Sequence, residues 1–322
     1  MASGYSWVYF EDKMEVVKDK LMEVQEFYNW TLSFSDPRVA DWPLMDGISN
    51  TLALSGLYLL IVWCGPIYMH KRKPFVLKWP LFIYNITLIA LNFYICFELL
   101  VGSYRAGYNY LCQPVTYSLD PNEMRIANAI WWFYVSKLIE MLDTVFFILR
   151  QKNEQITFLH VYHHVTMFPI WWIGTKWVAG GQSFLGALLN SSIHVMMYSY
   201  YGLSALGPAM QKYLWWKRYL TIVQLVQFVV GMIHATQSLL LSCNFPVWMH
   251  WALIFYGMSL LLLFLNFYYN SYVLKKRNRK KNGSSNSKKS LPKEANNSKK
   301  ADNKQYSKDS VASRRKTHAK DQ

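Results

Sequence analysis

The stretch HVYHH, at residues 160–164, lies inside the apolar run ITFLHVYHHVTMFPIWWIGTK, residues 156–176. As a helix, a run of about 20 residues crosses the roughly 30 Å hydrocarbon core of a bilayer. In that helix His160, His163 and His164 stand at positions i, i+3 and i+4, so the three imidazoles share one face. Ionisable side chains inside a membrane are rare and usually functional. The stretch therefore predicts a membrane-spanning helix with either a reactive surface or a metal site.

Comparable apolar runs recur along a chain of 322 residues that is 52% hydrophobic and 17% aromatic. We predict an all-α membrane protein with seven transmembrane helices, which puts the two termini on opposite sides. The predicted spans are residues 44–68, 80–102, 126–149, 156–176, 182–205, 214–237 and 247–274. The organisation is then an N-terminal segment of residues 1–43, a catalytic membrane domain of residues 44–274 and a basic tail of residues 275–322.

The positive residues near the span ends predict the orientation. One side carries residues 70–73, Arg150, Lys152, Lys212, Lys217, Arg218 and residues 275–277, while the other carries little. Because Lys and Arg accumulate on the cytosolic side, the N-terminus is predicted to be lumenal and the C-terminus cytosolic. The sequon at Asn29 then lies in the lumen and is predicted to carry a glycan, whereas the sequons at Asn282 and Asn296 lie in the cytosolic tail and are not.

The net charge of +15 lies mainly in the tail, where 17 Lys and Arg stand against 4 Asp and Glu. A segment rich in Lys, Ser and Asn cannot bury a core and is predicted to be disordered. We interpret it as a solubilising tail that touches anionic membrane lipid, and we expect no nucleic-acid partner.

Cys112 and Cys243 fall in the two predicted lumenal loops that follow the second and sixth spans. In that oxidising compartment we predict a disulfide between them, although sequence gives no distance between the two residues.

Polar residues inside other spans decide how the histidines are interpreted. Lys137, Glu140 and Asp143 stand three apart in KLIEMLDT. Asn190 and His194 lie at i and i+4 in the fifth span. Gln224 and Gln227 lie three residues apart in the sixth span. Each of these polar side chains would cost free energy if it faced lipid. We therefore expect the polar stripes that they form, one on each helix, to face the interior of the protein in the cytosolic half of the membrane. Hydrogen bonding between helices is an equally good explanation for the two glutamines.

Two chemistries suit such a cluster. Membrane di-iron desaturases and hydroxylases use HxxHH motifs because imidazole suits iron, but they need several such motifs, and this chain has one among eight His. The alternative is metal-free catalysis, in which a neutral imidazole attacks a thioester and a second His moves protons. A seven-helix receptor or transporter is a further alternative, but it has no need for three clustered His.

Four motifs resemble the signature boxes of the elongation of very long chain fatty acids family. They are KLIEMLDT, QITFLHVYHH, NSSIHVMMYSYY and TIVQLVQ, and they occur in the family's order. The stretches WWIGTKWVAGGQ and GPAMQKYLWWKRYL are similar to its very-long-chain branch. The resemblance implies six of the seven helices forming a barrel around an acyl tunnel. It also implies a 3-ketoacyl-CoA synthase of the endoplasmic reticulum that condenses acyl-CoA with malonyl-CoA, without a metal or other cofactor.

The same resemblance implies roles for individual residues. His163 would form an acyl-imidazole, and His194 would serve malonyl decarboxylation or proton transfer. The residues implied to orient them are His160, His164, Asn190 and Tyr162. Those implied to shape the site and contact CoA are Lys137, Glu140, Asp143, Gln224 and Gln227. Lys217 and Arg218 could contact CoA phosphates, or serve only as topology charges.

The end of the chain departs from the family pattern. Family tails often carry a dilysine-like retrieval signal, and here His318 stands where a second basic residue is expected before Lys320. Residence in the reticulum could then depend on partners. The expected partners are the reductases and dehydratase of the elongation cycle and a possible second copy of the chain.

Overall fold

A computed structural model gives the backbone of residues 3–274 and the side chains of residues 13–274. The chain divides into two units, residues 1–273 and residues 274–322, and the description concerns the first. The described residues form helices and connecting turns, with no β-strand among them. The expectations for Asn282, Asn296, the disordered tail and the retrieval signal lie outside the described residues.

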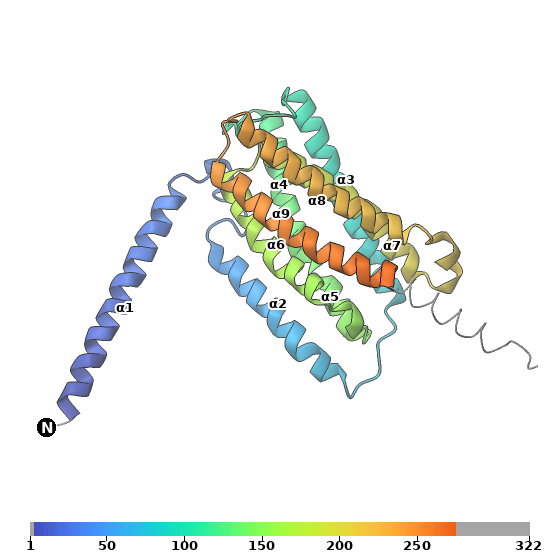
Figure 1. Cartoon of the computed structure of the whole chain (residues 1–322), viewed down its shortest axis with the longest axis horizontal. Coiled ribbons are helices and arrows are strands. Elements are labelled where there is room, and N and C mark those ends of the chain that lie inside the picture. The colour runs from blue at the N-terminus through green and yellow to red at the C-terminus, as the bar shows by residue number, and fades with distance from the viewer. Residues whose placement is uncertain (1–2, 275–322) are drawn as a thin grey trace, which may run out of the picture. The chain divides into compact units, whose positions relative to one another are not determined.

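Helices occupy every range in which a membrane span is predicted (Figure 1). They are α2 (Ile48–Met69), α3 (Lys78–Arg105), α4 (Pro121–Glu140), α5 (Leu142–Leu149), α6 (Phe158–Trp177), α7 (Ser183–Ala205), α8 (Lys217–Leu240) and α9 (Val247–Tyr268). One prediction is corrected, because the single span of residues 126–149 is two helices, α4 and α5, separated at Met141.

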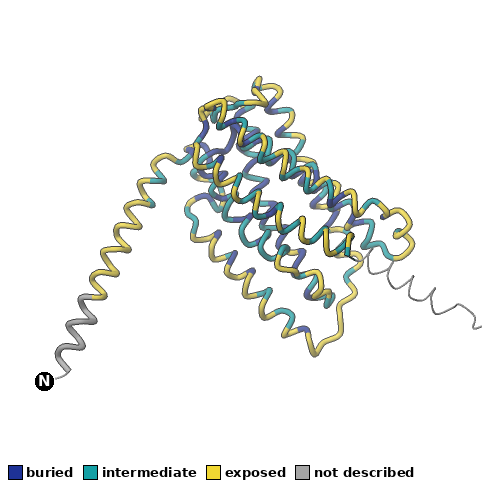
Figure 2. Tube along the Cα trace, in the orientation of Figure 1, coloured by how far each residue is buried: buried dark blue, intermediate teal, exposed yellow. Residues whose placement is uncertain are grey.

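Four of the described helices are long and apolar enough to cross a membrane: α2, α3, α8, and α9 with the turn that follows it. Helices α4, α6 and α7 carry the charged and polar residues singled out above, which lowers their hydropathy. These three helices contact their neighbours along much of their length (Figure 2). The protein is thus a helical membrane protein whose polar helices are shielded by apolar ones.

Local sequence signals set where the polar helices begin. Helix α4 starts with Pro121 after Asp120, whose carboxylate accepts a hydrogen bond from the Asn122 backbone N–H. Helix α6 starts after Thr157, whose hydroxyl accepts from the His160 backbone N–H. Both are N-cap arrangements that satisfy a backbone donor left free by the first turn. The cap at Thr157 also fixes the start of the helix that carries the three histidines.

Contacts between helices return to their starting point in the order α3, α4, α6, α9, α8, α7 and α3 again. Helix α2 lies outside this order and packs on α5 and α6 (Figure 1). Aromatic side chains fill much of the core. Tyr134 and Phe168 stack with ring centroids 4.8 Å apart, and Phe133 meets Trp171 edge-on at 4.4 Å. This packing holds α4 against α6, the pair that brings the acidic residues to the histidines.

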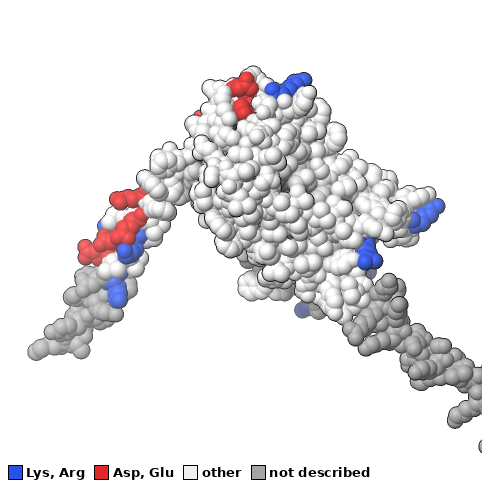
Figure 3. Space-filling view, turned by 45° about the horizontal axis from the view of Figure 1, so that its top comes forward, with Lys and Arg blue, Asp and Glu red and all other residues white. Residues whose placement is uncertain are grey.

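The helices connect at two ends that differ in charge. We call the end formed by loops 33–47, 106–120, 178–182 and 241–246 the disulfide end, because Cys112 and Cys243 are joined there, with their Cα atoms 5.5 Å apart. We call the end formed by loops 70–77, 150–157 and 206–216 the basic end. On the face shown in Figure 3, the surface between the two ends carries almost no charged residue. That uncharged band suits a lipid-facing surface.

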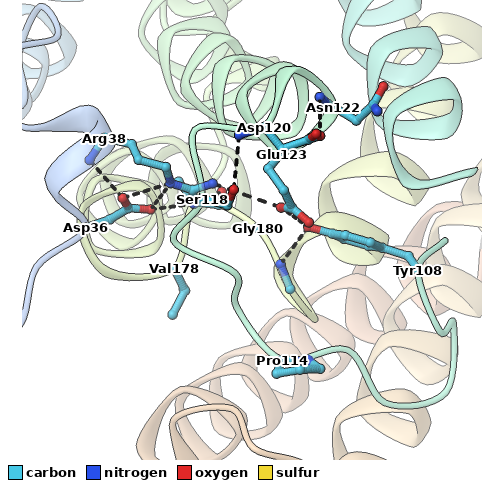
Figure 4. Close-up of polar contacts among 12 residues, drawn as sticks. Asp36, Arg38, Tyr108, Pro114, Ser118, Asp120, Asn122, Glu123, Val178 and Gly180 are labelled. Carbon is cyan, nitrogen blue, oxygen red and sulfur yellow. Dashed lines mark hydrogen bonds and ion pairs between the residues drawn. The ribbon is translucent and has the colours of Figure 1, made fainter. Parts of the chain in front are cut away.

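The disulfide end is closed by a buried polar cluster (Figure 4). Arg38 pairs with Asp36 at 2.6 Å and donates to the Ala179 carbonyl, while the Tyr108 hydroxyl donates to Glu123 at 2.7 Å. Burial, reinforced by the Glu123 carboxylate, raises the pKa of Tyr108 above its ordinary value, so the phenol keeps its proton. These contacts tie the segment before α2 to the loops before α4 and α7.

The sequence analysis missed a long helix, α1 (Ser3–Leu32), in the segment before the first predicted span. Residues 13–27 are exposed along it. Asn29 is also exposed, and its side chain accepts a hydrogen bond from Gln25. Helix α1 meets the rest of the unit at its C-terminal end, where Trp177 donates to the Thr31 carbonyl.

Candidate active site

The interruption at Met141 separates the acidic residues of KLIEMLDT onto two helices. The Met141 backbone N–H bonds to Leu138 and that of Thr144 to Met141, three residues back instead of the four of an α-helix. Lys137 and Glu140 lie in the last turn of α4, while Asp143 and Thr144 lie in the first turn of α5, which begins at Leu142. The tightened turn gives each pair of residues its own set of partners.

Glu140 joins the charged residues of α4 to the polar residues of α7. Its carboxylate lies 2.9 Å from the Lys137 ammonium and 3.0 Å from His194 Nδ1. The Lys137 ammonium also donates to the Asn190 amide oxygen at 3.1 Å, and Ser136 donates to Glu140 at 3.3 Å. Lys137 and Glu140 are almost completely buried. A buried charge is tolerated when it is paired and hydrogen-bonded, as here.

This arrangement leaves His194 with one nitrogen free. Its Nδ1 atom is engaged by Glu140, so Nε2 is the atom available to accept or donate a proton. A carboxylate that orients an imidazole in this way fixes the tautomer and supports general acid/base chemistry. The His194 side chain lines a cavity of about 410 Å³, so its free nitrogen can serve a molecule bound there.

The three histidines of α6 lie together, as their spacing predicts. The rings of His160 and His164 have centroids 4.5 Å apart, and those of His163 and His164 are 5.2 Å apart. All three line the same cavity as His194. His163 makes no hydrogen bond through its ring to any described residue, whereas the His160 ring bonds to Thr144. An imidazole that faces a cavity without a competing partner is suited to act as a nucleophile.

The cavity extends from the histidines to the basic end. The predicted site residues that line it are Glu140, Asp143, His160, His163, His164, Asn190, His194, Lys217, Gln224 and Gln227. Asp143 accepts a hydrogen bond from the Tyr198 hydroxyl at 3.0 Å, and Gln224 lies 3.6 Å from the Met197 sulfur. Residues from four polar stripes that are far apart in sequence therefore meet at one site.

Three of the predicted site residues do not line this cavity. Lys137 lies behind Glu140 and acts on the site through it. The Tyr162 hydroxyl hydrogen-bonds to Ser259 of α9 and does not approach the histidines. The Arg218 guanidinium donates to the Tyr268 hydroxyl on the outside of α8. Tyr162 is two residues from His160, and Arg218 is one residue from Lys217, so helical geometry turns both away from the cavity.

Sequence reasoning also missed residues that the structure brings to the site. Tyr198 follows His194 by four residues, and Thr144 ends the KLIEMLDT motif, so spacing could have indicated both. Arg150 lines the cavity at the basic end, where it had been counted only as a topology charge. Tyr58 of α2 hydrogen-bonds to Thr144, and no sequence signal could have indicated this contact.

Comparison with known proteins places the chain in a family. The sequence pattern of the family described as ELO: GNS1/SUR4 matches residues 43–281, which include every residue of the cavity. The chain belongs to this family. It is 60% identical over 259 residues to very long chain fatty acid elongase 4 of Macaca mulatta, covering 80% of this chain and 82% of the relative.

Other ELO family members show how far this likeness extends. The chain is 62% identical over 247 residues to very long chain fatty acid elongase 4 of Mus musculus, covering 77% of this chain and 79% of the relative. It is 48% identical over 250 residues to very long chain fatty acid elongase 5 of Xenopus laevis, covering 77% and 84%. The predicted family is confirmed, and the higher identity lies with elongase 4.

Proposed function

We propose that this chain is a 3-ketoacyl-CoA synthase that condenses long or very long acyl-CoA, saturated or polyunsaturated, with malonyl-CoA. The products are a 3-ketoacyl-CoA two carbons longer, carbon dioxide and CoA. Membership of the ELO family supports a role in fatty acid elongation. The observation that carries the condensation step is a cavity lined by both His163 and His194, the second of which is oriented by the Glu140 carboxylate.

The proposed first step is acyl transfer to the protein. A ring nitrogen of His163 attacks the thioester carbonyl of acyl-CoA, the carbon–sulfur bond breaks, and CoA leaves with the proton that the imidazole gives up. The thioester is already activated, so we propose that no metal or other cofactor takes part.

The proposed second step forms the new carbon–carbon bond. Malonyl-CoA loses its carboxylate as carbon dioxide, and the resulting enolate attacks the acyl carbonyl. The bond to His163 then breaks, and the imidazole regains a proton. His194, held at Nδ1 by Glu140, is placed to move protons through Nε2. His160, His164 and Asn190 would hold this arrangement in place.

We propose that the CoA portion enters at the basic end. Lys217, at the start of α8, and Arg150, directly after α5, both line the cavity there, so charges from two separate segments can meet phosphate groups. We assign this role to Arg150 and not to Arg218, because the Arg218 guanidinium already donates to the Tyr268 hydroxyl. Gln224, Gln227 and Asp143 line the path between this mouth and the histidines.

We further propose that the chain resides in the endoplasmic reticulum with its N-terminus lumenal and C-terminus cytosolic. Seven spans, six of them forming a barrel around an acyl tunnel, agree with the closed order of contacts described above. The basic end then faces the cytosolic acyl-CoA pool. The reductases and dehydratase that complete the cycle remain the proposed partners, together with a possible second copy of the chain.

Purified protein supplied with acyl-CoA and labelled malonyl-CoA tests the proposal. A labelled 3-ketoacyl-CoA two carbons longer supports it. Oxygen- and iron-dependent oxidation of the acyl chain would support a di-iron enzyme instead, and absence of turnover a receptor or transporter. Activity that is lost with a chelator and restored by a metal would overturn the metal-free mechanism.

Acyl-CoA supplied alone tests the role of His163. The protein should release about one equivalent of CoA per chain and retain an acyl group on His163, as expected for a covalent intermediate. The His163→Ala variant should lose both signals. If that variant still forms the adduct, the nucleophile is misassigned and His194 is the next candidate.

A further inference from the structure

A hydrogen-bonded chain reaches His160 from a helix that does not line the cavity. The Tyr58 hydroxyl of α2 lies 3.0 Å from Thr144 Oγ1, and Thr144 Oγ1 lies 2.8 Å from His160 Nε2. Tyr58 is 4% exposed and Thr144 is fully buried. His160 lines the cavity, whereas Tyr58 and Thr144 do not. Helix α2 is thereby linked to the candidate active site through a path of polar atoms.

The direction of these two hydrogen bonds follows from counting the hydrogen-bond donors. Among the described residues, Thr144 is the hydrogen-bonding partner of the Tyr58 hydroxyl. If His160 donated to Thr144, and Thr144 to Tyr58, the phenolic hydrogen would be buried without an acceptor, at a cost of about 1–3 kcal/mol. If Tyr58 donates to Thr144, the buried Thr144 hydrogen in turn needs an acceptor, and His160 Nε2 is the partner that the described residues give it. Both hydroxyl hydrogens are therefore satisfied when Nε2 accepts. Nε2 is then an acceptor, and the ring proton lies on Nδ1.

We propose that Tyr58 and Thr144 are positioning residues that hold His160 in its Nδ1–H tautomer and fix the orientation of its ring. Nε2 is occupied by Thr144, so Nδ1–H is the donor that remains for His164 or for a substrate oxygen. The rings of His160 and His164 are 4.5 Å apart, so the orientation of the first restricts the second. The effect on catalysis rests on the proposed function, whereas the tautomer does not.

The same helix provides a matched comparison. Thr51 of α2 and Tyr134 of α4 form a buried hydroxyl pair at 2.7 Å, seven residues before Tyr58. Both are fully buried, and neither hydroxyl bonds to a site residue. This pair ties α2 to the bundle as the Tyr58 pair does, but it has no connection to the histidines. Its loss measures what a packing role alone would do.

Kinetics of the full-length variants test the proposal. Tyr58→Phe and Thr144→Val should lower kcat by roughly 10- to 100-fold, as loss of an orienting partner commonly does, with KM nearly unchanged. Thr144→Ser should restore kcat. The Tyr58→Phe/Thr144→Val double variant should lose no more kcat than Thr144→Val alone, because both residues act through one path.

The control variants Thr51→Val and Tyr134→Phe should retain kcat at a comparable loss of thermal stability. Equal losses of kcat in both pairs would overturn the proposal.

A second measurement is independent of turnover. Nitrogen NMR of protein labelled at histidine distinguishes the two neutral tautomers, and the His160 signal is identified by its absence in His160→Gln. The wild-type chain should show Nδ1–H at His160, and Thr144→Val should lose this preference. A wild-type Nε2–H tautomer would overturn the inference. An inactive wild-type chain that shows the Nδ1–H tautomer would instead reject the proposed function alone.

Discussion

Glu140 contacts both the Lys137 ammonium and the His194 imidazole. Its carboxylate pairs with the Lys137 ammonium and also orients His194, and it lies where α4 ends. The first contact stabilises a buried charge, and the second orients the imidazole that we propose moves protons. Substitutions at this position should therefore affect stability and activity through separable contacts.

We expect Glu140→Gln to lower both stability and activity. The variant leaves the Lys137 ammonium buried without a carboxylate, which typically costs about 3–5 kcal/mol. The Lys137→Met/Glu140→Gln double variant removes that charge and should regain much of the stability. It should remain inactive, because His194 still lacks its carboxylate. Thermal unfolding and condensation assays on the three proteins check this, and an active double variant would contradict the role of Glu140.

At the residue scale, the sequence predicts which residues share a helix face better than it predicts which side chains they contact on other helices. The i, i+3 and i+4 spacing correctly brought His160, His163 and His164 to one cavity. The same helical geometry, applied to each residue separately, would have turned Tyr162 away, since it stands two residues from His160. The contacts of Glu140 with His194 and of Tyr58 with Thr144 cross between helices, and their distances follow from packing that local spacing does not encode.

At the element scale, turns decide how the polar helices meet. The interruption at Met141 was missed because KLIEMLDT contains no Gly or Pro, the residues that usually mark a helix break. Helix α1 was missed because its charged and aromatic residues alternate without an apolar run of membrane length. Apolar length predicted most helix positions, but it carried no information about either of these features.

Gly181, between α6 and α7, is the glycine that we expect to tolerate substitution least. Its φ is +56°, and an added Cβ would lie 2.8 Å from the Val115 backbone nitrogen. We expect Gly181→Ala to destabilise the protein by about 1–3 kcal/mol through backbone strain, with the clash adding to it. Gly186 of α7 is a matched control, because a Cβ there meets nothing within 4 Å. Thermal unfolding that is equal for both alanine variants would contradict this account.

The bond between Cys112 and Cys243 closes a loop with a sequence separation of 131 residues that contains α4 to α8. We expect nonreduced peptide mapping to recover the two cysteines as one cross-linked pair. Cys112→Ser/Cys243→Ser should lower stability, by about 2–5 kcal/mol if it behaves as typical native disulfides do. Cys64→Ser, at an exposed free thiol of α2, is the control and should change little. Free thiols at both Cys112 and Cys243 would reject the prediction.

At the scale of the whole molecule, charge divides the bundle into a basic end and a disulfide end. The sequence predicted the basic loops and the location of the cavity near them, because both follow from counting along the chain. It could not predict the buried cluster of Asp36, Arg38 and Glu123 at the opposite end, since Glu123 is in the first turn of α4, more than 80 residues after Asp36 and Arg38. Such contacts depend on how all the helices are assembled.

The orientation of the whole molecule predicts where a glycan can be attached. Asn29 is exposed on α1 and precedes the first predicted span, so a lumenal N-terminus makes its sequon accessible. We expect a shift in electrophoretic mobility that glycosidase treatment and Asn29→Gln both abolish. Asn282→Gln and Asn296→Gln should leave that mobility unchanged, because an odd number of spans puts the tail on the opposite side. A glycan on Asn296 would place the tail in the lumen and refute the seven-span orientation, and with it the cytosolic entry of CoA at the basic end.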